Sequence, residues 1–172
     1  MKRQSRRTLC AAGLITAALA SGAFAQQQEE KLGTLSFPIS CDPKVQAEFE
    51  RGVAMIHSYW FVVARRVFEG VLQQDPACAI AYWGIALSLL NNPFIGMPPA
   101  SNLPLGLAAL EKGKAVGAKT QRERDYIDAL AIMYVDYNKI GHGPRIQAFL
   151  KAMEALAAKY PDVANDLRAF SR

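Results

Sequence analysis

Apolar residues recur at steps of three and four along most of this 172-residue chain, and this helical spacing restricts its possible folds more than any other feature. No stretch alternates between apolar and polar residues with period two, so the sequence predicts helices and no strands. Pro, Gly and Asn divide the pattern into segments of ordinary helical length. The chain is therefore expected to be all-α.

Boundary residues locate six expected helices. Asp42-Pro43 opens the first, with Asp as the cap and Pro in the first turn. Asp75-Pro76 ends the second, because proline disfavours α geometry in the residue before it. Thr120 and Glu123 form a capping box for the fifth. The expected helices are 43–60, a second ending at Asp75, 79–90, 104–117, 121–138 and 145–160.

The helix starts recur along the chain. Val45 and Ala79 are 34 residues apart, and the steps from Ala79 to Gln121 and from Gln121 to Val163 are each 42 residues. Helix pairs that recur at such spacing are typical of a solenoid, in which each pair buries its apolar face only against its neighbours. We expect an array of about three antiparallel helix pairs.

Residues 1–25 have the three parts of a secretory signal peptide. Four basic residues precede the apolar stretch 9–20, and residues 23–25 (AFA) offer a small-x-small cleavage site. The apolar stretch is too short for a membrane span. Export to the periplasm is therefore expected. The Sec route and the Tat route both stay open, because Arg6-Arg7 partly matches a twin-arginine signal.

Removal of this segment changes the charge balance. Four of the 20 basic side chains and none of the 15 acidic ones lie in residues 1–25, which leaves 16 against 15. Nucleic-acid binding needs a clustered excess of Lys and Arg, so it is not expected. Residues 26–42 are interpreted as a polar linker, and no later stretch is apolar enough to span a membrane.

The first helix pair resembles a tetratricopeptide repeat, a helix–turn–helix unit of 34 residues. With Val45 at position one, Gly52 and Ala64 fall where the repeat has small residues. Phe68 then falls at the large apolar position of the second helix, and Pro76 at the terminal proline. The next unit carries its signature at Tyr82, Ile85, Ala86 and Leu89.

Four longer stretches resemble exported bacterial tetratricopeptide-repeat proteins of unknown function. They are FPISCDP, HSYWF, FEGVLQQDPACAIAYWGIALSL and RERDYIDALA, and the resemblance covers roughly residues 37–161. It implies a helical array over 43–161 and the start of an incomplete fourth repeat over 162–172. One interpretation of that last segment is a product truncated relative to longer relatives.

The resemblance also implies a concave groove lined by the first helix of each pair. The groove positions here are Gln46, Phe49, Val53, Ile56 and His57 in the first unit, and Ile80, Trp83, Leu87, Leu90 and Asn91 in the second. The candidate binding residues are Phe49, Val53, Ile56, His57, Trp83, Leu87 and Leu90. This surface is unusually apolar and lacks the Lys/Arg clamp for a peptide carboxylate. Either a partner's apolar segment or helix occupies it, or the linker, the loop 91–104 or further repeats cover it.

Cys41 and Cys78 remain once Cys10 leaves with the signal peptide. In stacked helix pairs the starts of the first and third helices lie side by side at one edge. A disulfide between the two cysteines is therefore predicted for an exported chain. The alternative is two free thiols.

Catalytic and cofactor-binding motifs are not found in the sequence. It has no C-x-x-C-H, no Gly-rich phosphate loop, no G-x-S-x-G and no H-E-x-x-H. His57 could bind a metal with Met55 or Met97, but it lacks a second His at ligand spacing, which favours a structural role. The run 122–125 (RERD) is interpreted as a solvated first turn. We expect no catalytic residue, no bound metal and no cofactor.

These features favour an exported, non-enzymatic protein–protein interaction module, acting as a scaffold or assembly factor in the cell envelope. Its partner, a protein or peptide, is not identified by the sequence. The alternatives are an exported protein that binds a small ligand or a metal, and a truncated remnant of a longer repeat protein. A fold alone does not decide among them.

Overall fold

The computed structural model describes residues 32–33 and 35–161. The predicted signal peptide, the first part of the predicted linker and the predicted fourth repeat lie outside these residues. The described part of the chain holds six α-helices and no strand, so the all-α prediction is confirmed. The helices are α1 (Gln46–His57), α2 (Phe61–Gln74), α3 (Ala79–Leu89), α4 (Asn102–Val116), α5 (Gln121–Ala131) and α6 (His142–Lys159), with short 3-10 helices η1 (Pro43–Val45) and η2 (Pro93–Ile95). None of these helices combines the length and the apolar character that a membrane crossing needs.

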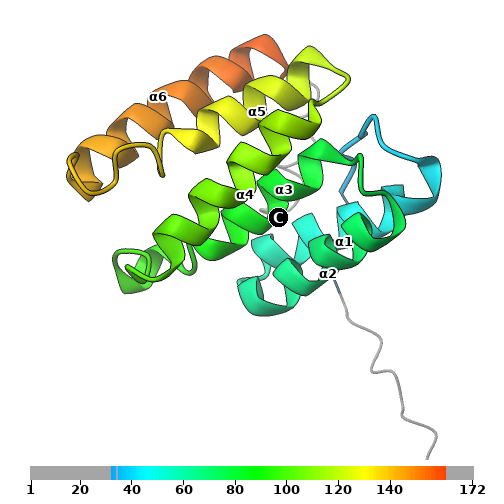
Figure 1. Ribbon diagram of the computed structural model, residues 1–172, viewed down its shortest axis with the longest axis horizontal. Coiled ribbons are helices and arrows are strands. Elements are labelled where there is room, and N and C mark those ends of the chain that lie inside the picture. The colour runs from blue at the N-terminus through cyan, green and yellow to red at the C-terminus, as the bar shows by residue number, and fades with distance from the viewer. Residues whose placement is uncertain (1–31, 34, 162–172) are drawn as a thin grey trace, which may run out of the picture. The chain divides into compact units, whose positions relative to one another are not determined.

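The helices pack in chain order, each against the next (Figure 1). α1 also contacts α3, and α3 contacts α5, so the first helices of successive pairs lie against one another. α3 is central to this packing and buries eight of its 11 residues. Its sequence is apolar on nearly all sides, as expected of a helix enclosed by neighbours.

The ring of Phe68 on α2 holds the first three helices together. It lies against Gly52 of α1 and Gly84 of α3, where an added Cβ would be 2.8 Å and 2.5 Å from a ring carbon. Cβ atoms do not approach other atoms so closely, so both positions need glycine. The prediction that Gly52 permits a close helix contact is confirmed.

Several helix boundaries agree with the sequence. α3 and α5 begin at Ala79 and Gln121 as expected, and the Thr120 hydroxyl caps α5 by accepting the Glu123 N–H at 3.3 Å. α4 and α6 begin two and three residues earlier than expected. In both, a proline lies in the first turn, where its missing N–H has no helical partner to lose.

The predicted extension of the fifth helix to residue 138 is wrong. α5 ends at Ala131, and turns follow, with Asp136 at a positive φ of 51°. Tyr134 is buried and its hydroxyl donates to the Ala86 carbonyl at 2.5 Å. The buried Arg145 donates to the carbonyls of Ile140, at 3.1 Å, and Met133. The backbone of residues 132–135 continues with turn bonds such as Met133 N–H to the Leu130 carbonyl at 3.0 Å, while these side-chain bonds hold the turns against the rest of the fold.

The two ends of the helix array differ. The turns within the three pairs, α1–α2, α3–α4 and α5–α6, gather at one end, which we call the turn end (Figure 1). The connections α2–α3 and α4–α5 lie at the other end. Residues 35–41, which we call the strap, are joined to the α2–α3 connection through Cys78 and to the start of α5 through Glu123.

Candidate functional site

The strap runs in extended form across the first helices of all three pairs. Phe37 is completely buried, and its ring contacts the rings of Phe49 on α1, Trp83 on α3 and Tyr126 on α5. The centroid distances are 5.5, 5.7 and 5.3 Å. Contacts of this kind add to the free energy gained from burying the rings. Phe37 therefore fills the groove that the sequence predicts.

Side chains of α1 bond the main chain of the strap. The Phe37 N–H donates to Glu50 Oε1 at 2.9 Å, and the Ile39 N–H donates to Gln46 Oε1 at 3.0 Å. Gln46 Nε2 in turn donates to the Phe37 carbonyl at 3.0 Å. Both ends of the Gln46 amide are thus used to hold one extended segment.

Side chains of α5 bond the next part of the strap. The Ser40 N–H donates to Glu123 Oε1 at 2.6 Å, and the Ser40 hydroxyl donates to Glu123 Oε2. Glu123 is only 1% exposed. Arg122 donates to the Pro38 carbonyl, and its guanidinium lies 5.2 Å above the Phe37 ring. The interpretation of Arg122 and Glu123 as members of a solvated turn is therefore wrong.

Cys41 and Cys78 form the predicted disulfide. Asp75 supports this junction, because its carboxylate accepts the N–H groups of Asp42 at 2.8 Å and Ala77 at 3.1 Å. The ligand atoms of Cys41, Asp75 and Cys78 lie within 4.8 Å of one another, a spacing that could hold a metal ion. The two sulfur atoms are bonded to each other here, so neither is a thiolate ligand.

Three of the seven predicted groove residues are buried and do not form an open surface. They are Phe49, Val53 and Trp83. Of the two alternatives, an open groove or a covered one, the structure shows the groove covered at Phe49 and Trp83. The ring that covers it there is Phe37, from the segment predicted as a linker. The linker interpretation of residues 26–42 therefore does not hold for the strap, which is part of the core.

The other four predicted groove residues meet at the turn end. Ile56, His57, Leu87 and Leu90 line an open pocket of about 260 Å³. Its lining is completed by Tyr59, Phe61, Asn91, Pro93 and Phe149. Although His57 is exposed overall, desolvation of its imidazole lowers its pKa below the ordinary 6.5, so the ring is neutral at pH 7.

Large apolar side chains are exposed around this pocket. We call them the apolar rim, and they are Tyr59, Trp60, Val62, Phe94, Ile95 and Met97, with exposed fractions between 46% and 80%. The Tyr59 and Phe94 rings, 5.7 Å apart, connect the α1–α2 turn to the α3–α4 loop. A second, shallow hollow adjoins the pocket at Tyr59 and Asn91 and is lined by Trp60 and Val62. The rim is therefore one surface built from two turns.

The possible metal ligands around His57 do not come together on this surface. Met55 is completely buried in the core, whereas Met97 is exposed on the rim. His142 begins α6 and does not line the pocket. The geometry therefore gives no support to a metal site at His57.

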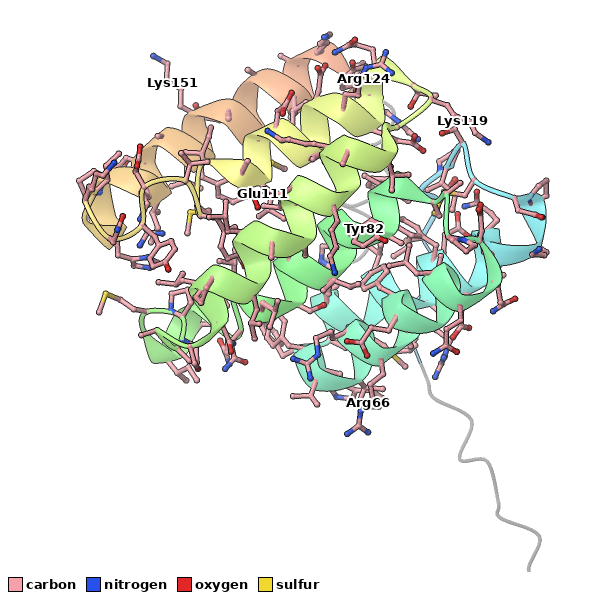
Figure 2. All side chains as sticks on the ribbon, in the orientation of Figure 1. Arg66, Tyr82, Glu111, Lys119, Arg124 and Lys151 are labelled. Atoms are coloured by element: carbon pink, nitrogen blue, oxygen red, sulfur yellow. A yellow bond between two sulfur atoms is a disulfide. The ribbon has the colours of Figure 1, made fainter. Side chains whose placement is uncertain are left out.

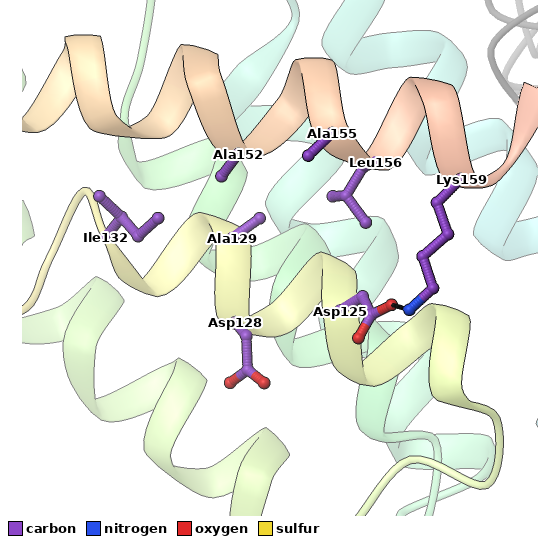
Figure 3. A pocket seen from close by; sticks show the side chains of 8 residues that line it. All are labelled: Asp125, Asp128, Ala129, Ile132, Ala152, Ala155, Leu156 and Lys159. Atoms are coloured by element: carbon purple, nitrogen blue, oxygen red, sulfur yellow. Dashed lines mark hydrogen bonds and ion pairs between the residues drawn. The ribbon is translucent and has the colours of Figure 1, made fainter.

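A different hollow, of about 400 Å³, lies between α5 and α6 (Figure 3). Its two carboxylates already have partners, since Asp125 bonds Lys159 Nζ at 2.6 Å and Asp128 bonds Lys114 Nζ at 2.7 Å. The hydrogen bond from Lys159, with those from Gln121 and Tyr160, lowers the pKa of Asp125 to about 2. Much of the remaining lining is alanine and other aliphatic side chains. We interpret this hollow as the seam between two helices.

Sequence reasoning missed the strap, although a signal for it exists. Leu35, Phe37, Ile39 and Cys41 alternate with Ser36, Pro38 and Ser40. The statement that no stretch alternates with period two is therefore wrong for these residues. Ser36 and Pro38 are exposed, while the apolar members face the core. The buried role of Glu123 has no comparable signal, because its partner Ser40 lies 83 residues away.

No protein-family model, no curated protein and no solved structure matches this chain. Its function must therefore be argued from the strap, the pocket and the apolar rim.

Proposed function

We propose that this chain is an exported, tetratricopeptide-like interaction module that holds an apolar segment of a partner protein at its turn end. The observation that carries the proposal is the apolar rim around the open pocket. Large contiguous apolar patches on a protein surface commonly mark sites of interaction. Here the patch continues a groove whose other half already holds an extended segment, the strap.

The helix packing supports the tetratricopeptide-like part of the proposal. Neighbouring helices pack in order, and α3 also contacts α1 and α5, the first helices of the pairs before and after it. This pattern is expected when each repeat contacts only its neighbours. The close approach of Phe68 to Gly52 supports the assignment of one large and one small position in the first repeat.

The chemistry of the pocket favours an apolar side chain as its occupant. The lining contains no Lys, Arg, Asp or Glu, and its one histidine is neutral at pH 7. A carboxylate or another ion would therefore enter without a charged partner. A volume of about 260 Å³ is below the usual range for small-molecule sites, roughly 300–1,000 Å³. One or two large side chains of a peptide fit this space better.

The disulfide supports the proposal that the protein acts outside the cytoplasm. Cys41 and Cys78 are bonded, and such bonds persist mainly in oxidising compartments. The periplasm is the compartment we propose, in agreement with the predicted signal peptide. A scaffold or assembly factor in the envelope is the role that best combines these features.

The proposal can be tested by site-specific photo-crosslinking in cells that export the full-length protein. A photoreactive residue in place of Phe94 should give a recurrent adduct with one protein. The same residue in place of Lys151, which points away from α6 (Figure 2), should not. The adduct should be lost in the variant Ile95→Asp, which should still fold because Ile95 is 75% exposed. It should be kept in the control variant Val116→Asp, at the last residue of α4. Equal adducts from positions 94 and 151, or an adduct indifferent to Ile95→Asp, would contradict the proposal.

A further inference from the structure

We infer that the surface beneath the strap is itself a binding site for an extended segment of a partner protein. The strap is its resident occupant, and reduction of the Cys41–Cys78 disulfide makes the site available. This inference rests on the proposed function, because it assigns the covered half of the same groove. It adds the class of segment that is bound and the condition under which binding occurs.

The strap is held in the way that a peptide is held in a groove. Three of its N–H groups, those of Phe37, Ile39 and Ser40, donate to side-chain oxygens of α1 and α5. The carbonyls of Phe37 and Pro38 accept from side chains of the same two helices. Main-chain groups recognised by side chains can be supplied by any extended segment, while pockets for alternate side chains give specificity.

The pockets beneath the strap define the class of segment. The ring of Phe37 is enclosed by three aromatic rings, and Leu35 and Ile39 are half-buried against the core on either side. Ser36 and Pro38 between them are exposed, so their identity is less restricted. Ser40 gives two hydrogen bonds to the buried Glu123. The site therefore fits an uncharged segment of the form apolar-x-aromatic-x-apolar-Ser or Thr.

The disulfide controls how strongly the strap competes for this site. Cys41 is the last strap residue and is partly exposed, whereas Cys78 is completely buried at the start of α3. While the bond is intact, the strap stays next to the groove at a high effective concentration. Once it is broken, the chain at Asp42 is the remaining covalent tether between the strap and the helices. A partner segment can then replace the strap.

The reductant required is a dithiol. One of its thiolates attacks the sulfur of Cys41, the more exposed of the two residues, and Cys78 leaves as a thiolate that takes up a proton. The second thiol of the reductant then resolves the mixed disulfide and releases Cys41 as a thiol. Two electrons pass to the protein, and the reductant becomes a disulfide.

Hydrogen exchange of the mature wild-type protein, with and without a dithiol, tests the release of the strap. After reduction, exchange at the amides of Phe37, Ile39 and Ser40 should accelerate by a factor at least ten times larger than that of the α3 amides, whose rates rise only with the loss of global stability. Unchanged rates in the strap would overturn the inference. An equal increase in α3 would also overturn it, because reduction would then unfold the protein instead of opening the site.

A peptide-binding experiment tests the site itself. The probe is a fluorescent synthetic peptide carrying residues 33–42 with serine at position 41. It should not bind the oxidised wild-type protein, but it should bind reduced Phe37→Ala protein, whose own strap is weakened. Alanine in place of the peptide's phenylalanine, or Glu123→Gln in the same protein background, should each weaken binding about tenfold or more.

Three outcomes would overturn the inference. The two peptides could bind equally well, or neither could bind a reduced Phe37→Ala protein that keeps its helical circular dichroism and its melting transition. Light scattering could also show a dimer of the reduced wild-type protein, which would assign the site to the strap of a second copy. The probe does not contact the apolar rim. If the peptide does not bind but the crosslink at position 94 forms, only this inference is rejected. If the peptide binds but that crosslink does not form, only the proposed partner site at the turn end is rejected.

Discussion

At the scale of single residues, the ring of Phe68 shows how little space separates the first three helices. Gly84→Ala would place a methyl group 2.5 Å from that ring, and overpacking of this kind costs about 1–3 kcal/mol of stability. Gly70→Ala in α2 is the matched control, because its Cβ would meet nothing within 4 Å. It should stabilise the helix by about 0.5–1 kcal/mol. Urea unfolding of both variants measures the two changes, and a Gly84→Ala protein as stable as wild type would contradict the packing described here.

Residues also differ in how readily a sequence reveals their role. Gly52 and Phe68 follow from the register of the repeat, because both belong to one local helix pair. Glu123 does not, since its hydrogen-bond partner Ser40 lies 83 residues away. Local charge patterns predict solvated turns correctly only while no distant segment packs on them.

At the scale of helices, α6 is held more loosely than the others, with only Arg145 and Leu156 buried among its described residues. Asp125 of α5 helps to hold its C-terminal end through Lys159, at 2.6 Å, and the Tyr160 hydroxyl, at 2.7 Å. The pKa of Asp125 is about 2 in the folded protein and 3.8 ordinarily. Its contribution to stability is therefore complete above about pH 4 and is lost as the pH falls toward 2.

Asp125→Asn should remove this part of the pH dependence. Because the Lys159 side chain is 55% exposed, solvent screening limits the effect to about 0.5–1 kcal/mol. Urea unfolding at pH 5 and pH 2 should show a smaller loss of stability in this variant than in wild type. Glu154→Gln, at an exposed position of α6, should behave as wild type does. An identical loss in all three proteins would reject the role of Asp125.

Helix ends show where local reasoning stops. Caps and prolines locate the starts of α3 and α5, since these signals act through neighbouring residues. Beyond the end of α5, Tyr134 and Arg145 bond carbonyls of α3 and of the turn that follows α5. Such bonds depend on how the helices pack, so the helical pattern of residues 132–138 gives no warning of them.

At the scale of the whole molecule, the spacing of helix starts is enough to predict an all-α chain of helix pairs. The candidate site is only half predictable. Ile56, His57, Leu87 and Leu90 meet at the open pocket, and the resemblance to a repeat predicts these four residues for one groove. The burial of Phe49 and Trp83 beneath the strap is harder to predict, because the short alternating pattern of the strap lies in a segment that is otherwise polar. Its binding surface is also assembled from three different helix pairs.

Reduction of the disulfide should destabilise the whole fold. The bond joins residues separated by 37 positions, and closing a loop of that size is worth about 3–4 kcal/mol in the chain-entropy model. Calorimetry of the protein should therefore show a lower melting temperature in the presence of a dithiol. Cys41→Ser should show a similarly lowered value that no longer responds to the reductant. A melting temperature unaffected by reduction would contradict this contribution.

The same disulfide decides how the protein would respond to a mechanical load. Once tension from the N-terminal side has broken the bonds of the strap to α1 and α5, it passes through Cys41 directly to Cys78 and bypasses α1 and α2. Even when the helices are pulled apart, the 37-residue loop cannot lengthen. In single-molecule stretching, adding a dithiol should increase the extended length by about 130 Å, at roughly 3.5 Å per residue. After the strap has been pulled away, the first helix pair is thus a closed loop that carries no tension, while the helices that follow Cys78 bear the load.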